Sequence, residues 1–471
     1  MPPTLGPELA ESPLSRPYST QGVSLSRSST SSSRTFPDNA SIGSSPAYSS
    51  SSLSIPFEDG EVDVVRVEGL RHATYKLEAR MDLSAPAIQD PFLREDLLKV
   101  LRTLRASSWS EPNVTPEQVS IQKVSGSLTN AVFFVSCPSQ PRLRTMLLRI
   151  YGPSSGTLIN RSRELHILHV LSSKYHIGPR VYGTFENGRV EEYFDAVALT
   201  AADLRDPEVS SCISARMAEL HGVDVDAVEF DAQSSDGAED RGVQLGVNKN
   251  VPAWLAFARE VLSLPSAPAE IREGLDLDRF EREWELYTRW LDQKEMTDGL
   301  SRRVFSHNDT QYGNLLRMRT LKEGQPAHRQ IIVVDFEYAS PNPAAFDIAN
   351  HFHEWTTNYH GPNPHLLDPA RYPSLDERRN FYRAYLTHSA PQSDARSPAV
   401  EEVDHQAVQK LEDQVRVWSP ASHAMWTVWG VVQAREFIEG QDGEPEFNYL
   451  GYAVCRMEGF RRELRALSVV S

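Results

Sequence analysis

Two aspartates and an asparagine with spacing typical of phosphoryl transfer lie between residues 305 and 335. The segment 305–316 reads FSHNDTQYGNLL, in which Asn314 follows Asp309 by five residues, and the apolar run 331–334 ends at Asp335. In phosphoryl transfer from a nucleotide, one aspartate orients and deprotonates a hydroxyl, while an asparagine and a second aspartate hold Mg²⁺. A helix N-cap would explain either aspartate alone, but not both with the asparagine between them. We predict Asp309, Asn314 and Asp335 as catalytic residues, with Asn314 and Asp335 as the metal ligands.

Aromatic residues downstream form a second candidate group. They are Tyr338, Trp355, Tyr359, Trp426, Trp429, Phe447 and Tyr452. Aromatic faces attract a quaternary ammonium ion by about 0.5 to 2 kcal/mol per ring, and Glu354 would supply the counter-charge. Composition alone also fits rings that fill a hydrophobic core. His351 and His353 have no second ligand cluster at a plausible spacing, so we interpret them as structural residues rather than metal ligands.

The segment 118–150 predicts consecutive strands that would cover a nucleotide. Its turn at Ser125-Gly126-Ser127 resembles a phosphate-covering loop in position. It lacks the full G-x-G-x-x-G pattern, and a small-residue hairpin turn is the commoner explanation when such a turn is seen alone. Arg149 ends an apolar run, and Glu164 follows fifteen residues later in a segment of helical periodicity. In kinases, a cation on a strand and a carboxylate on a helix form an ion pair beside the nucleotide phosphates. An unrelated arginine and glutamate on the surface would give the same sequence pattern.

Helices and strands on either side of this segment complete the predicted architecture. Asn187-Gly188 predicts a hairpin between two short strands, and 192–194 then leaves the first lobe, where backbone groups would meet adenine. Helical periodicity is clear around 93–104, 213–220, 254–262, 276–293 and 446–467.

Composition shifts divide the chain into four parts. Residues 1–55 are serine-rich and predicted to be disordered, because they carry too few apolar residues to offset chain entropy. Residues 56–117, with a strand at 62–67, form an extension packed on the first lobe, which spans 118–195. The second lobe spans 196–471 and includes an acidic, small-residue segment at 224–250 that we predict to be a flexible insertion.

Charge and cysteine content exclude several classes. The net charge of −16 argues against nucleic-acid binding, for which a basic stripe is expected. Three cysteines, with no CxxC pair, make a disulfide framework or cysteine zinc site improbable and favour a reducing compartment. No apolar run reaches the ~18 residues of a membrane span, and no signal-peptide segment begins the chain. We expect a cytoplasmic protein.

The chain resembles the choline/ethanolamine kinase family from about residue 90 to 460. The resemblance rests on SGSLTNAVF, LLRIYG, GPRVYGTFENGRVEEY, SHNDTQYGNLL, VVDFEYASPNPAAFDIANHFHEW and HAMWTVWGVVQA. It implies an α+β, two-lobed protein-kinase-like fold with a small β-rich N-lobe and a larger, mostly helical C-lobe. It also implies transfer of the ATP γ-phosphoryl group to choline with Mg²⁺, the first step of the CDP-choline route to phosphatidylcholine, and it admits a homodimer.

The resemblance also implies roles for particular residues. Asp309 would receive or orient the choline hydroxyl, and Asp335 would hold Mg²⁺. The ATP site would comprise Ser125, Gly126, Ser127, Asn130, Arg149, Glu164, Glu192, Phe194 and Gln311. The choline pocket would comprise Tyr338, Glu354, Tyr359, Trp426, Trp429, Phe447 and Tyr452. Ser125 stands where a glycine is common, and His353 replaces a small residue.

Three alternatives remain at this stage. An ethanolamine kinase would share the catalytic residues, although the aromatic complement favours a trimethylammonium group over a primary ammonium, which gains more from hydrogen-bond acceptors. An aminoglycoside-type phosphotransferase would need an extended acidic groove. A catalytically inactive scaffold would not need Asp309, Asn314 and Asp335 intact.

Overall fold

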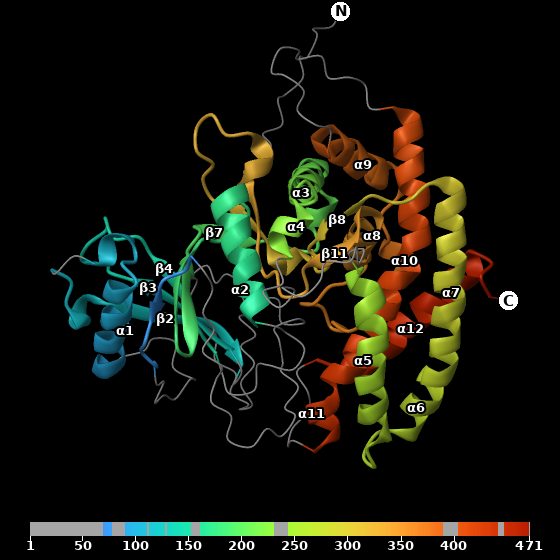
Figure 1. Ribbon diagram of the computed structural model, residues 1–471, viewed down its shortest axis with the longest axis horizontal. Coiled ribbons are helices and arrows are strands. Elements are labelled where there is room, and N and C mark those ends of the chain that lie inside the picture. The colour runs from blue at the N-terminus through green and yellow to red at the C-terminus, as the bar shows by residue number, and fades with distance from the viewer. Residues whose placement is uncertain are drawn as a thin grey trace, which may run out of the picture.

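A computed structural model describes residues 69–77, 90–110, 113–127, 130–151, 161–229, 244–389, 404–440 and 447–470. The side chains of 107–108, 124–127, 130–131 and 161 are not described. Figure 1 shows two lobes, one built around strands and one built almost wholly of helices. The predicted α+β, protein-kinase-like architecture is confirmed. The predicted tail at 1–55 and strand at 62–67 lie outside the described residues.

The N-lobe is organised on a six-stranded sheet of order β1-β5-β6-β4-β3-β2. All its neighbouring strands are antiparallel except the pair β1 and β5. The predicted turn at Asn187-Gly188 joins β5 to β6. The strands are β1 (His72–Ala73), β2 (Ser120–Ser127), β3 (Asn130–Ser136), β4 (Met146–Tyr151), β5 (Val181–Phe185) and β6 (Gly188–Glu192).

The described part of the N-terminal extension belongs to the N-lobe core. Helix α1 (Pro91–Thr103) begins at Asp90, whose side chain accepts from the N–H groups of Phe92 and Leu93. Its buried leucines at 93, 97, 98 and 101 lie in one hydrophobic cluster with residues of β2, β3 and β4. The other N-lobe helix is α2 (Arg161–Val170), which carries Glu164.

The C-lobe consists of helices around a long central one. Helix α10 packs against α12, α5 and α8, while α3 packs against α9. The helices are α3 (Pro207–Leu220), α4 (Val225–Val228), α5 (Gly246–Ser263), α6 (Ala269–Leu275), α7 (Leu277–Asp298), α8 (Ala344–Glu354), α9 (Leu375–Ser389), α10 (His405–Gln433), α11 (Arg435–Ile438) and α12 (Tyr449–Ala466). Within the described residues, no helix is long and apolar enough to cross a membrane.

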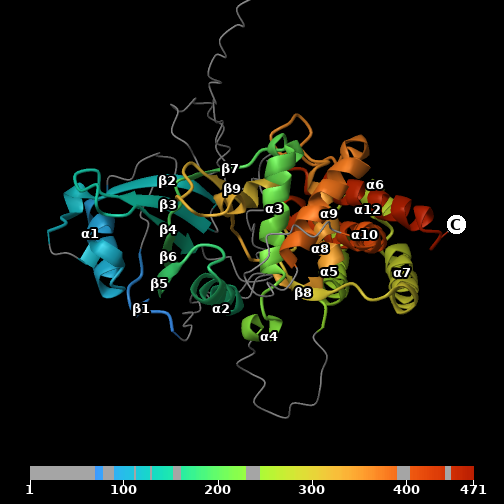
Figure 2. The same cartoon turned by 90° about the horizontal axis from the view of Figure 1, so that it is seen from above.

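Two small antiparallel sheets hold the segment 303–343 at the junction of the lobes. One has the order β10-β9-β7, and the other pairs β11 with β8. Figure 2 shows β7 and β9 between the six-stranded sheet and α3. The strands are β7 (Ala196–Ala198), β8 (Arg303–Ser306), β9 (Leu315–Met318), β10 (Ile331–Val333) and β11 (Ser340–Pro343).

The predicted flexible insertion at 224–250 is wrong at both ends. Asp224 accepts from the N–H of Asp226 and begins α4, and α5 already starts at Gly246. Asn342 Oδ1 accepts from Val247 N at 3.0 Å, which satisfies an N–H group in the first turn of α5. This tertiary contact has no local sequence signal. Residues 230–243 lie outside the described residues.

Candidate active site

The predicted catalytic residues Asp309 and Asn314 lie in the loop between β8 and β9. Asp309 is 2% exposed. The Nδ2 of Asn314 donates to Asp309 Oδ2 at 2.8 Å and to the backbone oxygen of Asp309 at 3.0 Å. The remaining oxygen, Asp309 Oδ1, is buried without a hydrogen-bond partner among the described residues. The five-residue spacing therefore folds the amide onto the carboxylate. It leaves one aspartate oxygen and the Asn314 Oδ1 atom available for a substrate or metal.

Asp347, on α8, anchors the start of this loop. Its Oδ2 accepts from His307 N and from His221 Nε2, each at 3.0 Å, and its Oδ1 accepts from Asn308 N at 2.8 Å. Burial alone would raise the pKa of Asp347, but the hydrogen bonds and the charges of His221 and His307 bring it below the ordinary value. Asn308 has φ +66°, the left-handed region, and Asp347 helps to hold it there.

Asp335 follows β10 and reaches the same loop. Val334 N donates to Asn314 O at 3.0 Å, which places the end of β10 beside Asn314. Asp335 has φ +67° and is partly buried. Burial, together with the charges of Glu354, Asp335 and Glu337, raises the pKa of Asp309 well above its ordinary value. The two predicted catalytic aspartates thus lie close enough to repel each other.

Arg149 and Glu164 face this carboxylate group, but the predicted ion pair between them is wrong. Glu164 accepts from Arg189 Nη2 at 2.8 Å, while Arg149 Nε lies 3.9 Å from Glu191 Oε1. The reason is strand register, because Arg189 on β6 is directly opposite Arg149 on β4. Adjacent strands place such partners on one face, so two cations share two carboxylates. Arg149 still lowers the pKa of Asp335, against the larger opposing effect of burial.

The other predicted nucleotide residues lie on two sides of the lobe junction. Gln311 is wholly buried; its Oε1 accepts from Gly313 N at 2.8 Å, and its Nε2 has no partner among the described residues. Glu192 N donates to Arg180 O, so that N–H is not free for adenine, and Phe194 lies in the link to β7. At the end of the hairpin of β2 and β3, Ser125 pairs with Val132, Gly126 with Ala131 and Ser127 with Asn130.

The predicted choline-site rings come together in one buried cluster. Ring centroids are 5.4 Å apart for Tyr338 and Trp426, 5.2 Å for Trp426 and Trp429, and 6.0 Å for Trp429 and Tyr452. Phe447 continues the series at 5.7 Å from Tyr452 and 6.5 Å from Tyr359. Most of these pairs are edge-to-face, an arrangement favoured by ring quadrupoles. We call these six rings the aromatic cluster. Trp355 lies apart and donates to His351.

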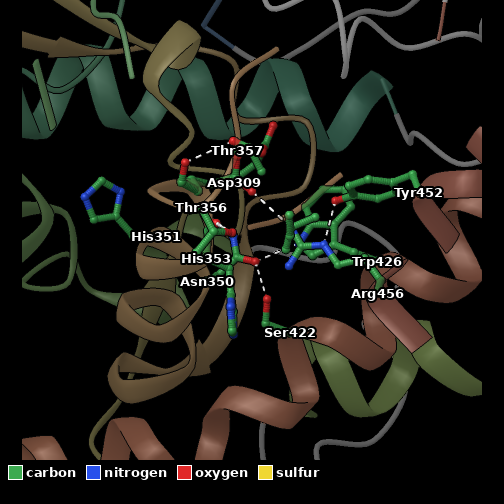
Figure 3. A network of polar contacts seen from close by, with 12 residues as sticks. Asp309, Asn350, His351, His353, Thr356, Thr357, Ser422, Trp426, Tyr452 and Arg456 are labelled. Atoms are coloured by element: carbon green, nitrogen blue, oxygen red, sulfur yellow. Dashed lines mark hydrogen bonds and ion pairs between the residues drawn. The ribbon is translucent and has the colours of Figure 1, made fainter. Parts of the chain in front are cut away.

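Glu354, at the end of α8, is fixed within this cluster by an arginine that the sequence did not single out. Tyr359 OH donates to Glu354 Oε2 at 2.6 Å, and Arg456 Nη2 donates to Oε1 at 3.1 Å. Arg456 Nε also donates to Tyr452 OH at 2.9 Å (Figure 3). Burial raises the pKa of Glu354, and Arg456 opposes that shift. The carboxylate is therefore both paired and close enough to act on Asp309.

A hydrogen-bonded chain joins the aromatic cluster to the catalytic loop. Trp426 Nε1 and Ser422 Oγ each donate to Asn350 Oδ1 at 2.7 Å (Figure 3). Asn350 Nδ2 donates to Asn308 O at 2.9 Å, one residue before Asp309. Asn350, like Asp347, was missed from the sequence. Their four- and seven-residue spacing from Glu354 on one helix was the available signal.

The two histidines of α8 differ in their surroundings. His351 is structural as predicted, because Nδ1 bonds Thr310 O at 2.8 Å and Nε2 accepts from Trp355. His353 has neighbours that a search by sequence spacing could not find. It lies beside His423 of α10 and Glu463 of α12, residues too distant in sequence to be associated with it by spacing.

Comparison with known proteins agrees with this geometry. The family described as choline/ethanolamine kinase matches residues 121–461. The choline kinase of Schizosaccharomyces pombe is 32% identical over 459 residues, covering 87% of this chain and 96% of that protein. The crystal structure of choline kinase from Cryptosporidium parvum aligns with TM-score 0.61 at 23% identity, covering 80% of this chain and 97% of the other. An ethanolamine kinase structure from Plasmodium vivax aligns with TM-score 0.57 at 22% identity, covering 78% and 90%. With most of its two lobes matched by one family, the chain belongs to the choline/ethanolamine kinases.

Proposed function

We propose that this chain transfers the γ-phosphoryl group of ATP to the hydroxyl of choline, giving phosphocholine and ADP. The observation that carries the proposal is the chain from Trp426 through Asn350 to Asn308, which ties the aromatic cluster to the residue preceding Asp309. An ammonium ion held by the rings would present its hydroxyl to Asp309. The choline oxygen forms a bond to the γ-phosphorus, the bond from that phosphorus to the ADP oxygen breaks, and the hydroxyl proton passes to Asp309.

The acceptor side of the proposal rests on charge and ring geometry. Six rings that are each 6% exposed or less surround a paired carboxylate, Glu354. Cation–π attraction is strongest where a cation is desolvated, and methyl groups on nitrogen need no hydrogen-bond acceptors. Because Arg456 already pairs with Glu354, this carboxylate would attract the ammonium ion with only part of its negative charge. The rings would supply most of the surface that contacts the ion.

The nucleotide side uses the unpartnered donor of Gln311 and the cations of the N-lobe. Gln311 Nε2 is a buried donor with no acceptor among the described residues, which suits a phosphate oxygen. Arg149 would contact the phosphates, while Arg189 holds the neighbouring carboxylates of Glu164 and Glu191. We assign the turn 125–127 with Asn130 to covering the phosphates, and Glu192 and Phe194 to the adenine side.

The donor atoms at the junction fit Mg²⁺. Asn314 donates its Nδ2 hydrogens to Asp309, so the amide oxygen of Asn314 can bind a metal. Asp335 provides a carboxylate. Oxygen donors are what this hard cation prefers. Burial and the charges of Glu354, Asp335 and Glu337 raise the pKa of Asp309, and a bound cation would relieve that repulsion. Asn314 and Asp335 would hold the ion, and when bound it would neutralise charge on the phosphates.

A series of acceptors that differ only in N-methylation tests the proposal. Choline, its dimethyl and monomethyl analogues and ethanolamine share the hydroxyl, so kcat/KM from a coupled ADP assay reports recognition of the nitrogen alone. We expect kcat/KM to fall as methyl groups are removed, because each removal adds an N–H donor that the rings cannot accept strongly. A kcat/KM for ethanolamine equal to or higher than that for choline would identify ethanolamine as the preferred acceptor. Absence of turnover with all four would refute it.

The setting of the reaction follows from the same proposal. Phosphocholine would enter the CDP-choline route to phosphatidylcholine, and we place the enzyme in the cytoplasm. Cys137, Cys212 and Cys455 are free thiols, which supports a reducing compartment. Cell fractionation that recovers the chain and its choline-dependent activity together outside the cytoplasm would contradict this placement.

A further inference from the structure

Three helices of the C-lobe bring two histidines and a glutamate to one point. His353 lies in the last turn of α8, His423 in α10 and Glu463 in α12, and one donor atom from each lies within 4.8 Å of the others. The imidazole centroids are 4.1 Å apart. Glu463 Oε1 is 3.5 Å from His423 Nε2 and 3.9 Å from His353 Nε2.

The polar atoms of this group are incompletely satisfied. Both ring nitrogens of His423 and Oε2 of Glu463 are buried without a hydrogen-bond partner in the part of the chain that the structure describes. His353 Nε2 makes one hydrogen bond, with Ser419 Oγ at 2.8 Å. Buried polar atoms are nearly always paired, and an unpaired group costs free energy. A ligand that accepts lone pairs from two imidazoles and a carboxylate would satisfy one nitrogen of His423 and the carboxylate, and so lower that cost.

The surroundings of both histidines favour the neutral imidazole. Burial lowers the pKa of His353 and of His423 well below the ordinary value, and the cations Arg456 and Arg462 lower both further. A metal ligand must be deprotonated, so this direction is compatible with ligation. Glu354 forms an ion pair with Arg456 at 3.1 Å and neutralises its charge. The surroundings of His353 and His423 are therefore less positive than Arg456 and Arg462 alone would make them.

Packing holds the rings in place and leaves a route to solvent. A Cβ atom at Gly459, one turn before Glu463, would lie 2.4 Å from His423 Cε1, so only glycine admits the ring against α12. Ser419 and Glu463 also line a cavity of about 240 Å³. Water in that cavity would complete a coordination shell and allow an ion to enter.

We propose that His353, His423 and Glu463 bind one divalent transition-metal ion, Zn²⁺ by donor type, with a fourth position open to the cavity. Zinc takes nitrogen at about 2.0–2.1 Å and carboxylate oxygen at about 2.0–2.2 Å in a tetrahedron, so its ligand atoms lie about 3.3–3.5 Å apart. The 3.5 Å separation already matches, and the 3.9 Å separation needs to close by a few tenths of an ångström. The two imidazole donor atoms lie within 4.8 Å of each other and would have to move to the same tetrahedral spacing when the ion binds.

The consequence is a link between three helices that also build the acceptor site. His353 is next to Glu354 on α8, His423 is three residues before Trp426 on α10, and Glu463 is seven residues after Arg456 on α12. An ion here would fix these helices relative to one another without touching the reacting atoms. Its role is therefore structural, and metal binding can be measured independently of kinase activity.

The test is zinc titration of the full-length, chelator-stripped chain by calorimetry, with excess Mg²⁺ and no nucleotide. We expect one zinc site and a higher midpoint of thermal unfolding with zinc. Glu463→Gln, which keeps shape and removes the ligand charge, should weaken zinc affinity at least ~100-fold, since loss of outer-shell partners alone costs 10–100-fold. The matched control is Glu458→Gln, an exposed glutamate on the same helix, which should bind zinc like the wild type.

A spectroscopic arm distinguishes this site from other carboxylates. Co²⁺ in a tetrahedral nitrogen–oxygen site absorbs visible light far more strongly than octahedral Co²⁺, so the wild-type chain should show that band. Both Glu463→Gln and His353→Gln should lose it, so the test survives if one of these variants fails to fold. Equal zinc affinity in wild type and in the folded variants, or no zinc uptake by the wild type, would overturn the proposal.

Discussion

Asp347→Asn tests whether the catalytic loop is held by one buried carboxylate. Asp347 accepts from two consecutive loop N–H groups, those of His307 and Asn308, and from His221 Nε2. An asparagine has nearly the same shape but only one acceptor oxygen. If that oxygen takes the Oδ2 position, the amide nitrogen faces Asn308 N–H. If it takes the Oδ1 position, the nitrogen faces His307 N–H instead.

Either orientation therefore leaves one buried loop N–H without an acceptor. A hydrogen bond to a charged group contributes about 1.5–3 kcal/mol, and a buried donor without an acceptor costs about 1–3 kcal/mol. The two values overlap, because both include the loss of the same hydrogen bond. We expect the free energy of unfolding to fall by about 2–4 kcal/mol. Asn308 would be less firmly held at φ +66°, and a displacement of ~1 Å at the neighbouring Asp309 can lower kcat about 10²-fold.

Urea unfolding and steady-state kinetics measure the two effects separately. The control is Asp376→Asn on α9, where the aspartate side chain is 95% exposed, and we expect wild-type stability and turnover there. We also expect little change in either KM for Asp347→Asn, because Asp347 contacts no proposed ligand site. A variant that loses stability but keeps wild-type kcat would show that the loop is positioned by other contacts. Unchanged stability would refute the hydrogen-bond argument itself.

Three further predictions follow from the site. Asp309→Ala should lower kcat about 10²-fold or more while leaving the ATP KM near wild type, since general-base catalysis supplies about 10²–10⁴; unchanged turnover would remove Asp309 from the mechanism. Trp429→Leu should raise the choline KM about 3- to 30-fold through loss of cation–π attraction worth 0.5–2 kcal/mol, and an effect on the ATP KM alone would contradict the acceptor site. Burial lowers the pKa of His351 from 6.5 to about 4, so the unfolded chain binds one more proton between those values and stability falls as pH drops through that window. The full loss attributable to His351 is about 3 kcal/mol, of which about 2 kcal/mol falls between pH 7 and pH 5. Urea unfolding at these two pH values should therefore show a shallower pH dependence in His351→Gln.

Local patterns were sufficient for the reacting residues. Asp309 and Asn314 lie five residues apart in one loop and are joined by hydrogen bonds. Their sequence spacing was therefore enough to predict that the two side chains lie together. Asp335 followed from an apolar run that could only be a buried strand. The hairpin at Asn187-Gly188 and the helix beginning at Asp90 also depend on turn and capping chemistry within a few residues.

Pairings between distant charges depended on the tertiary structure. Glu164 has several arginines available, and the register of β4 against β6 selects Arg189 rather than Arg149. Nothing in an amphipathic helix distinguishes Arg456, which becomes the partner of Glu354 only when α12 packs near α8.

The sequence by itself determined the reaction type and a family, because contacts within one loop and residues at fixed offsets encode both. Only the tertiary structure decided which rings meet, which cations neutralise which carboxylates, and that His353 meets His423 and Glu463. The physical reason is that charge pairing and metal ligation act over a few ångströms in space. Helix packing, not sequence spacing, sets those distances between residues up to 110 positions apart.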